Sequence, residues 1–284
     1  MALRFNVQVR KRYEPNKYAG IYFAKKMPEV LADDRVPISV AEFMQLRLSA
    51  LDLFADSLEN PKKYNRMYRT KVAKFFKDVW GINADTGDAA LYNPDGRIKI
   101  DLDSELIRKI NPAMESELLG GAIRLPSGLY EVTDNKLELT KTEVQKFANM
   151  HQKENETLDN RFWRIFARNP NEVPSKYAED PNLLKNYAKA VNRLANIVFS
   201  YDTTMGVYVT DASKDSFTLR PWYVRRLRGG SGAEGRDDLV YSIGRLVGVA
   251  PEAPRLAVPS TERLEQIIAT ITKHSPEVKR LLAA

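Results

Sequence analysis

Two basic segments hold the side chains best suited to chemistry in this chain of 284 residues. Residues 62–77 contain seven basic side chains and no acid, and residues 220–236 contain five arginines and one acid. Lys and Arg neutralise phosphates, and neighbouring aromatic rings can stack on unpaired bases. The pattern predicts binding to nucleic acid, single-stranded RNA or DNA in preference to duplex, through Lys62, Lys63, Arg66, Arg69, Lys74, Lys77, Arg220, Trp222, Tyr223, Arg225, Arg226, Arg228 and Arg236. A solvated helix face, or an acidic surface on a partner protein, would account for the same charge.

The segment 230–235 reads G-S-G-A-E-G, which matches the glycine spacing of dinucleotide-binding loops. Its surroundings argue against that function. Arginines occupy the preceding strand where a buried parallel strand is apolar, and Asp237 and Asp238 place negative charge where a pyrophosphate would bind. A mobile loop flanked by arginines is the better interpretation.

Asp101, Asp103 and Glu105 are candidates for a metal site, because Asp101 and Asp103 would point the same way along a strand. Capping of a helix that begins near Ser104 explains them more simply. The two histidines, His151 and His274, fit structural positions. We therefore expect no catalytic residue, no metal and no cofactor, and we keep a metal-dependent nuclease as a third alternative.

Helical periodicity and helix-capping signals dominate the rest of the chain. Capping boxes at Ser39/Glu42 and Thr140/Glu143 open two helices, residues 64–80 sort into an apolar and a cationic face, and Asp180-Pro181 begins a well-buried helix. Further helices are expected over 104–119, 140–168, 237–249 and from Thr261 and Pro276, with hairpins in 120–139 and from 206–210 to 217–227.

These elements predict a mainly α (α+β) fold, with a helical core in one or two lobes, short β-hairpins, and extended arms at both ends. The expected divisions are an N-terminal arm over 1–37, a helical lobe over 38–119, a second lobe with the hairpin and glycine loop over 120–250, and a helical C-terminal arm over 251–284. Both arms carry apolar patterns that could contact a neighbouring subunit, through Leu3, Phe5, Val7, Val9, Leu264, Ile268, Ile271 and Leu281.

The totals narrow the class of protein. Lys and Arg number 44 against 37 Asp and Glu, and cysteine is absent, which excludes disulfides and thiolate chemistry. No signal peptide or membrane span is expected, so the predicted location is the cytoplasm or a virus particle. The leading hypothesis is a non-enzymatic subunit of a homo-oligomeric assembly that contacts nucleic acid, such as a nucleocapsid, coat or phage head or neck protein. The alternative is a soluble accessory factor that binds single-stranded nucleic acid.

Overall fold

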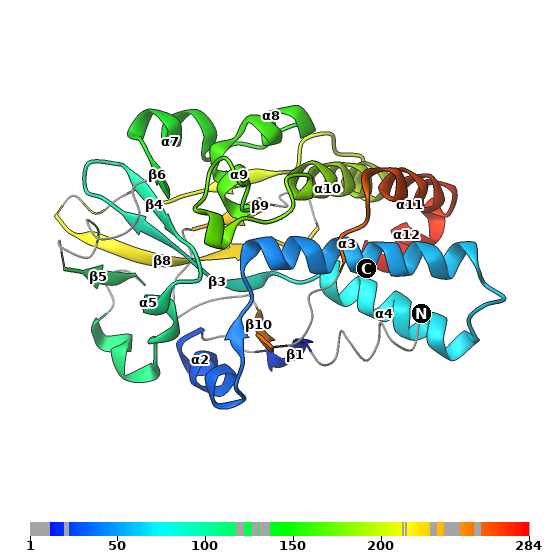
Figure 1. Cartoon of the computed structure of the whole chain (residues 1–284), viewed down its shortest axis with the longest axis horizontal. Coiled ribbons are helices and arrows are strands. Elements are labelled where there is room, and N and C mark those ends of the chain that lie inside the picture. Colours follow the sequence, from blue (N-terminus) through cyan, green and yellow to red (C-terminus); the bar gives the residue numbers. More distant parts are fainter. Residues whose placement is uncertain are drawn as a thin grey trace.

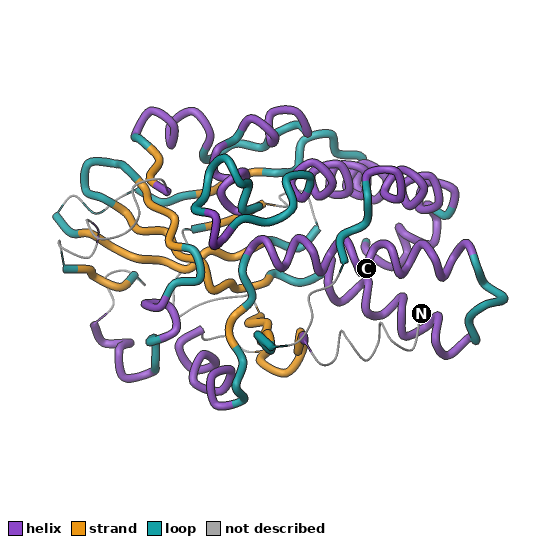
Figure 2. The backbone as a smooth tube through the Cα atoms, in the orientation of Figure 1, coloured by secondary structure: helices purple, strands orange, loops and turns teal. Residues whose placement is uncertain are grey.

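The structure of the chain is a computed structural model. It describes residues 12–19, 23–117, 122–126, 130, 137–211, 213, 215–227, 232–235, 245–252 and 257–283. A mixed sheet of ten strands forms its centre. Six strands follow one another in the order β1-β10-β3-β8-β9-β7, while β2 pairs with β10, β4 with β3, β5 with β8 and β6 with β4. β10 with β3 and β7 with β9 are parallel pairs, and the remaining pairs are antiparallel. The strands gather on one side of the molecule and the long helices on the other (Figures 1 and 2).

The strands are β1 (Tyr13–Ala19), β2 (Val36–Pro37), β3 (Ala84–Tyr92), β4 (Ile98–Asp101), β5 (Ile123–Leu125), β6 (Glu138–Leu139), β7 (Gly206–Tyr208), β8 (Phe217–Val224), β9 (Gly232–Glu234) and β10 (Arg245–Val249). The helices are α2 (Phe23–Ala32), α3 (Val40–Glu59), α4 (Arg66–Trp80), α5 (Glu105–Arg108), α7 (Lys141–Phe147), α8 (Glu154–Asp159), α9 (Arg161–Phe166), α10 (Leu183–Phe199), α11 (Thr261–Lys273) and α12 (Ser275–Leu282). Two 3-10 helices cover Pro112–Glu117 and Ser175–Tyr177.

The central strand β3 is buried along its whole length and sends alternate side chains into two cores. Ala90 and Tyr92 join the larger core under α3, α4, α9, α10 and α11, whereas Ala89 and Leu91 join a smaller core under α2 and α5. This alternation is the period of two that a strand imposes. Helices therefore cover both faces of the sheet at its centre.

The predicted mainly α fold with short hairpins is wrong, because one mixed sheet organises this α/β fold. β3 lies in a segment for which the sequence predicted neither a helix nor a strand. β7 and β8 do not form the predicted hairpin, since β9 lies between them, and β5 and β6 pair with β8 and β4 rather than with each other. Residues 245–249 are a strand, not the end of a helix.

Several predicted helices are confirmed, and others are shorter than expected. Thr140 and Glu143 form the predicted capping box, and α4, α10, α11 and α12 lie close to their expected positions. The helix expected over 140–168 is broken into α7, α8 and α9. Strands from the arm and from both predicted lobes share the one sheet, and no helix in the described ranges is long and apolar enough to cross a bilayer.

Candidate nucleic-acid interface

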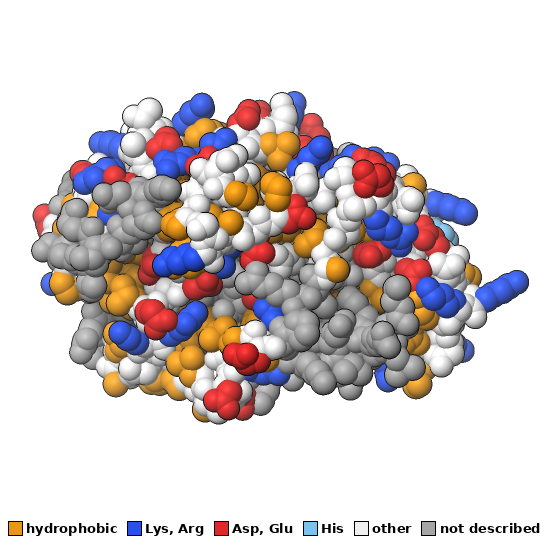
Figure 3. Space-filling model, in the orientation of Figure 1, with side chains coloured by type: hydrophobic (Ala, Val, Ile, Leu, Met, Phe, Trp, Pro, Cys, Tyr) orange, Lys and Arg blue, Asp and Glu red, His pale blue; other side chains and the backbone are white. Residues whose placement is uncertain are grey.

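The outer side of α4 carries a row of exposed basic side chains, here called the α4 cation face: Arg66, Arg69, Lys71, Lys74 and Lys77. Val72, Phe76, Val79 and Trp80 form the buried side of the helix, and Arg66, Lys74 and Lys77 point away from it. Arg69 lies at the border of that side and lines a pocket with residues of α3 and α12. Asn65 caps the helix, and its side chain accepts a hydrogen bond from the Tyr68 amide at 2.8 Å. From Arg66 to Lys77 the face extends ~16 Å at 1.5 Å per residue. Figure 3 shows a few basic side chains projecting from the end of the molecule where Figure 1 places the turn from α3 to α4 and α11.

Most charge on this face is uncompensated. Lys74 pairs with Asp78 at 2.5 Å. Among the described residues, Arg66, Arg69 and Lys77 have no ion pair. Like charges on one helix repel each other, and an anionic ligand that neutralises them removes this repulsion.

The turn before α4 is held by a separate small network. Lys63 pairs with Asp56 at 3.1 Å, and the Tyr64 hydroxyl donates a short hydrogen bond to the same carboxylate. Burial alone would raise the pKa of Asp56, but the hydrogen bonds from Tyr64 and Lys63 outweigh it and lower that pKa below its usual value. Because Tyr64 is buried and stacked on Tyr68, with 5.0 Å between ring centroids, it offers no free face to a base.

The second basic segment reaches the end of α4. The Leu227 amide donates to the Trp80 carbonyl at 2.8 Å, and the Arg226 amide donates to Asn83 Oδ1 at 2.8 Å. These bonds fix the backbone that follows β8 against the connection from α4 to β3. As a result Lys77 and the exposed Arg226 line one groove, although they are 149 positions apart in the sequence.

The buried Arg47 contacts both the end of α4 and the segment after β8. Arg47 on α3 is 1% exposed, and its guanidinium donates to the carbonyls of Val79, Ile82 and Arg225 and to the Tyr187 hydroxyl. Its guanidinium carbon also lies 4.5 Å from the Phe43 ring centroid and 5.2 Å from that of Trp80. Arg47 thus joins the end of α4 to the segment after β8.

Other predicted residues of the second segment do not face a ligand. Trp222 and Tyr223 are 0% and 2% exposed, so the prediction that they stack on bases is wrong. Arg225 pairs with the buried Glu234 at 2.5 Å, and Glu234 also accepts a 2.5 Å hydrogen bond from Tyr223. Glu234 therefore compensates the charge of Arg225.

The remaining predicted residues fall into three groups. Lys62 and Lys63 are exposed before α4, and Arg220 is half-buried on β8, away from its end. Arg228 and Arg236 lie outside the described residues, as do Leu3, Phe5, Val7 and Val9. Leu264 and Ile271, predicted as subunit contacts, are fully buried in this chain's own core, with Ile268 and Leu281 partly buried beside them, because α11 and α12 pack on α3, α4 and α10.

The groove between α4 and α12, here called the α4–α12 groove, has a volume of about 200 Å³. Its lining combines polar and apolar surface, with Lys77 and Arg226 as its charged members, and consists of Lys77, Gly81, Phe199, Arg226, Leu227, Leu281, Leu282 and Ala283. Phe199 stands at the end of α10, where Ser200 ends the helix in the left-handed conformation at φ 61°. Sequence patterns missed this groove because four separate segments form it.

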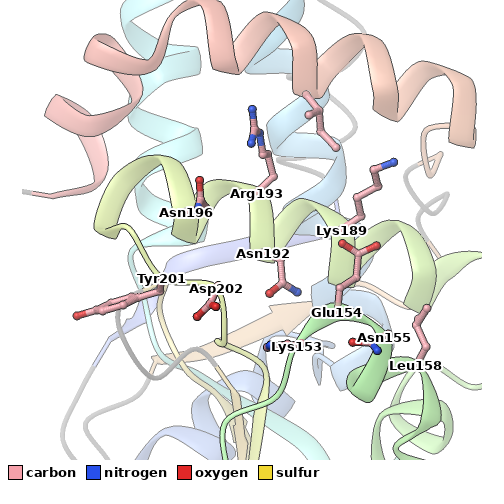
Figure 4. Close-up of a pocket in the computed structure, with 11 residues that line it drawn as sticks. Lys153, Glu154, Asn155, Leu158, Lys189, Asn192, Arg193, Asn196, Tyr201 and Asp202 are labelled. Atoms are coloured by element: carbon pink, nitrogen blue, oxygen red, sulfur yellow. The ribbon is translucent and has the colours of Figure 1, made fainter.

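A second pocket of about 510 Å³ lies between α8, α10 and the loop at 201–202 (Figure 4). It combines both signs of charge, with Lys153, Lys189 and Arg193 near Glu154 and Asp202. Two of its cations are already engaged, since Lys189 pairs with Glu265 and Arg193 donates to the Thr272 hydroxyl at 3.1 Å. The pocket is therefore a poorer phosphate site than the α4 cation face.

The acidic cluster on the sheet is structural in its contacts. β4 ends at Asp101 and Asp103 lies in a turn at φ 52°, so the two do not share a strand face as predicted. Asp103 pairs with Arg168 at 2.7 Å. Burial raises the pKa of the neighbouring Asp88 to about 6. Among the described residues there is no group of three or more His, Asp and Glu placed to hold a metal ion.

The glycine motif has a packing explanation at its described positions. A Cβ atom at Gly232 would collide with the carbonyl oxygen of Gly206 on β7, and one at Gly235 would lie 2.9 Å from the Trp222 ring. His151 lies in the break between α7 and α8, inside the range where one helix over 140–168 was expected. Its side chain is exposed, with a ring nitrogen 3.2 Å from the Tyr208 hydroxyl.

Comparisons with known proteins give little further information. No protein-family model matches the chain, and no curated protein matches it. One solved structure, described as "Accommodation of massive sequence variation in Nanoarchaeota by the C-type lectin fold", is similar over 83% of this chain and 100% of that chain, with 13% identity and a TM-score of 0.47. That likeness is too weak to carry an argument.

Proposed function

We propose that this protein binds the phosphate backbone of nucleic acid through the α4 cation face, without recognising base sequence and without catalysis. The observation that carries the proposal is the set of exposed cations on α4, of which Arg66, Arg69 and Lys77 have no ion pair among the described residues, with Lys77 at the α4–α12 groove. A face of ~16 Å is long enough to contact several successive phosphates of one strand.

The test is a fluorescence-anisotropy titration of labelled oligo-dT at several salt concentrations. A triple variant, Arg66→Ala, Arg69→Ala and Lys77→Ala, keeps the helix because alanine has the highest helix propensity. If these side chains contact phosphates, the salt dependence of log K falls by ~2, which is ~0.7 for each lost contact with a single strand.

The matched control removes three exposed cations elsewhere, with Lys109→Ala, Arg124→Ala and Lys185→Ala. Both triple variants lower the net charge equally, so only a local site makes them differ. An equal loss of affinity in both variants, or an unchanged salt slope in the first, would show that the α4 cation face is not the binding site.

The second half of the proposal is that the protein works as a subunit of a homo-oligomer, as nucleocapsid, coat and phage head or neck proteins do. Its support is the alternating pattern of residues 3–9, which fits a strand added to a neighbour's sheet. Light scattering with and without oligo-dT distinguishes this proposal, which requires large regular particles, from a monomeric or dimeric accessory factor.

A further inference from the structure

We infer that the α4–α12 groove receives one unpaired base of a single-stranded nucleic acid, while the phosphates beside that base lie on Lys77 and Arg226. This inference rests on the proposed function and names its substrate class. It also replaces Trp222 and Tyr223, whose burial excludes them, with a different place for a base.

The lining of the α4–α12 groove places apolar side chains next to two cations. Phe199, Leu281 and Leu282 are partly exposed apolar side chains that converge from the ends of α10 and α12, and the cations Lys77 and Arg226 belong to the same wall. A ligand that fits has a flat apolar unit next to an anionic group. A nucleotide with its base unpaired has this arrangement, because every base has a π-face and every nucleotide a phosphate.

The size and the position of the α4–α12 groove both suit a single base. A cavity of about 150 Å³ is enough to hold a benzene ring, so about 200 Å³ suits a single ring system rather than a larger ligand. The groove also lies where the row of cations on α4 ends, at Lys77. A strand bound at Lys77 therefore lies next to the groove.

A duplex cannot place a paired base in this groove. Its bases are stacked inside the helix, so placing one in the groove requires unpairing and unstacking it, which costs a few kcal/mol. The groove thus favours single strands, whereas the α4 cation face alone would bind any phosphate backbone.

The experiment compares oligo-dT of ten nucleotides with an oligomer of equal length in which abasic units replace the bases. Both carry the same phosphates, so a difference in affinity reports the bases alone. The expected preference of the protein for oligo-dT is about tenfold, which corresponds to one stacked base. Replacement Ala283→Trp fills the groove from an exposed position and should reduce the preference for oligo-dT over the abasic oligomer to less than twofold.

The control is Ala32→Trp, which places the same ring at the exposed end of α2 and should keep the preference. Equal binding of both oligomers by the wild type, or an unchanged preference in Ala283→Trp, overturns the base site while leaving phosphate binding by α4 intact. Failure of both oligomers to bind overturns the proposed function itself. A wild type that prefers a duplex of the same length also overturns the inference.

Discussion

Replacement of Arg47 by methionine should destabilise the protein more than any surface substitution on α4. The guanidinium donates to three backbone carbonyls and one hydroxyl at 2.8–3.3 Å, and methionine leaves these acceptors without their donor. Three unsatisfied carbonyls at ~1 kcal/mol each, with a cation–π contribution of ~1 kcal/mol, give a loss of about 4 kcal/mol. Relief from burying a charge works against this, so about 2–4 kcal/mol is expected.

The assay is urea unfolding followed by tryptophan fluorescence and circular dichroism, since Trp80 packs on the guanidinium. Arg47→Lys keeps the charge but cannot reach all the carbonyls at once, and it should fall between wild type and Arg47→Met. Arg66→Ala, an exposed arginine on α4, serves as the control and should change the unfolding free energy by less than ~0.5 kcal/mol. An Arg47→Met variant within ~1 kcal/mol of wild type would refute the reasoning, because the acceptors would then have found other donors.

Because the pKa of Asp88 is raised from 3.8 to about 6, the folded state holds more protons than the unfolded state between these values, and stability falls as pH rises through this window. Asp88→Asn lacks this titration. The difference between its unfolding free energy and that of wild type should therefore rise by up to ~3 kcal/mol from pH 4 to pH 7, in favour of the variant. Parallel pH profiles of the two proteins would contradict this. Gly232→Ala should lower the melting temperature by several degrees, because the new Cβ meets the Gly206 carbonyl on the paired strand, whereas a melting temperature equal to wild type would show that β7 and β9 can separate. Deletion of residues 1–11 should leave a folded protein that no longer forms large particles, and particles of unchanged size in light scattering would remove the arm from the assembly hypothesis.

The helices that sequence patterns located correctly have strong local signals. α4 combines an apolar stripe with a cationic one, and the capping box at Thr140 and Glu143 marks the start of α7. Such signals depend on residues a few positions apart, which is why they predict helices well. The exposed cations of α4 were predictable for the same reason.

The sheet was not predictable because its pairings are distant and its central strand is polar. β3 contains the buried polar side chains Asp85, Thr86 and Asp88, and aspartate is depleted in ordinary strands. Their partners come from remote segments: Thr86 donates to the Trp222 carbonyl at 2.6 Å, and Asp88 accepts from the Val40 amide at 2.8 Å. Likewise, the burial of Trp222 and Tyr223 follows from their position on β8, beside β3, which composition does not show.

The order of the sheet sets the order in which the chain can fold during synthesis. β3 ends at residue 92, yet its neighbours β8 and β10 begin only at residues 217 and 245. The helices α3 and α4 are complete long before β8 and β10 leave the ribosome. During that time the apolar side of this helix pair stays uncovered. Because pairings between remote segments close slowly, this protein is expected to fold in a late, sheet-limited step and to need protection from aggregation until then.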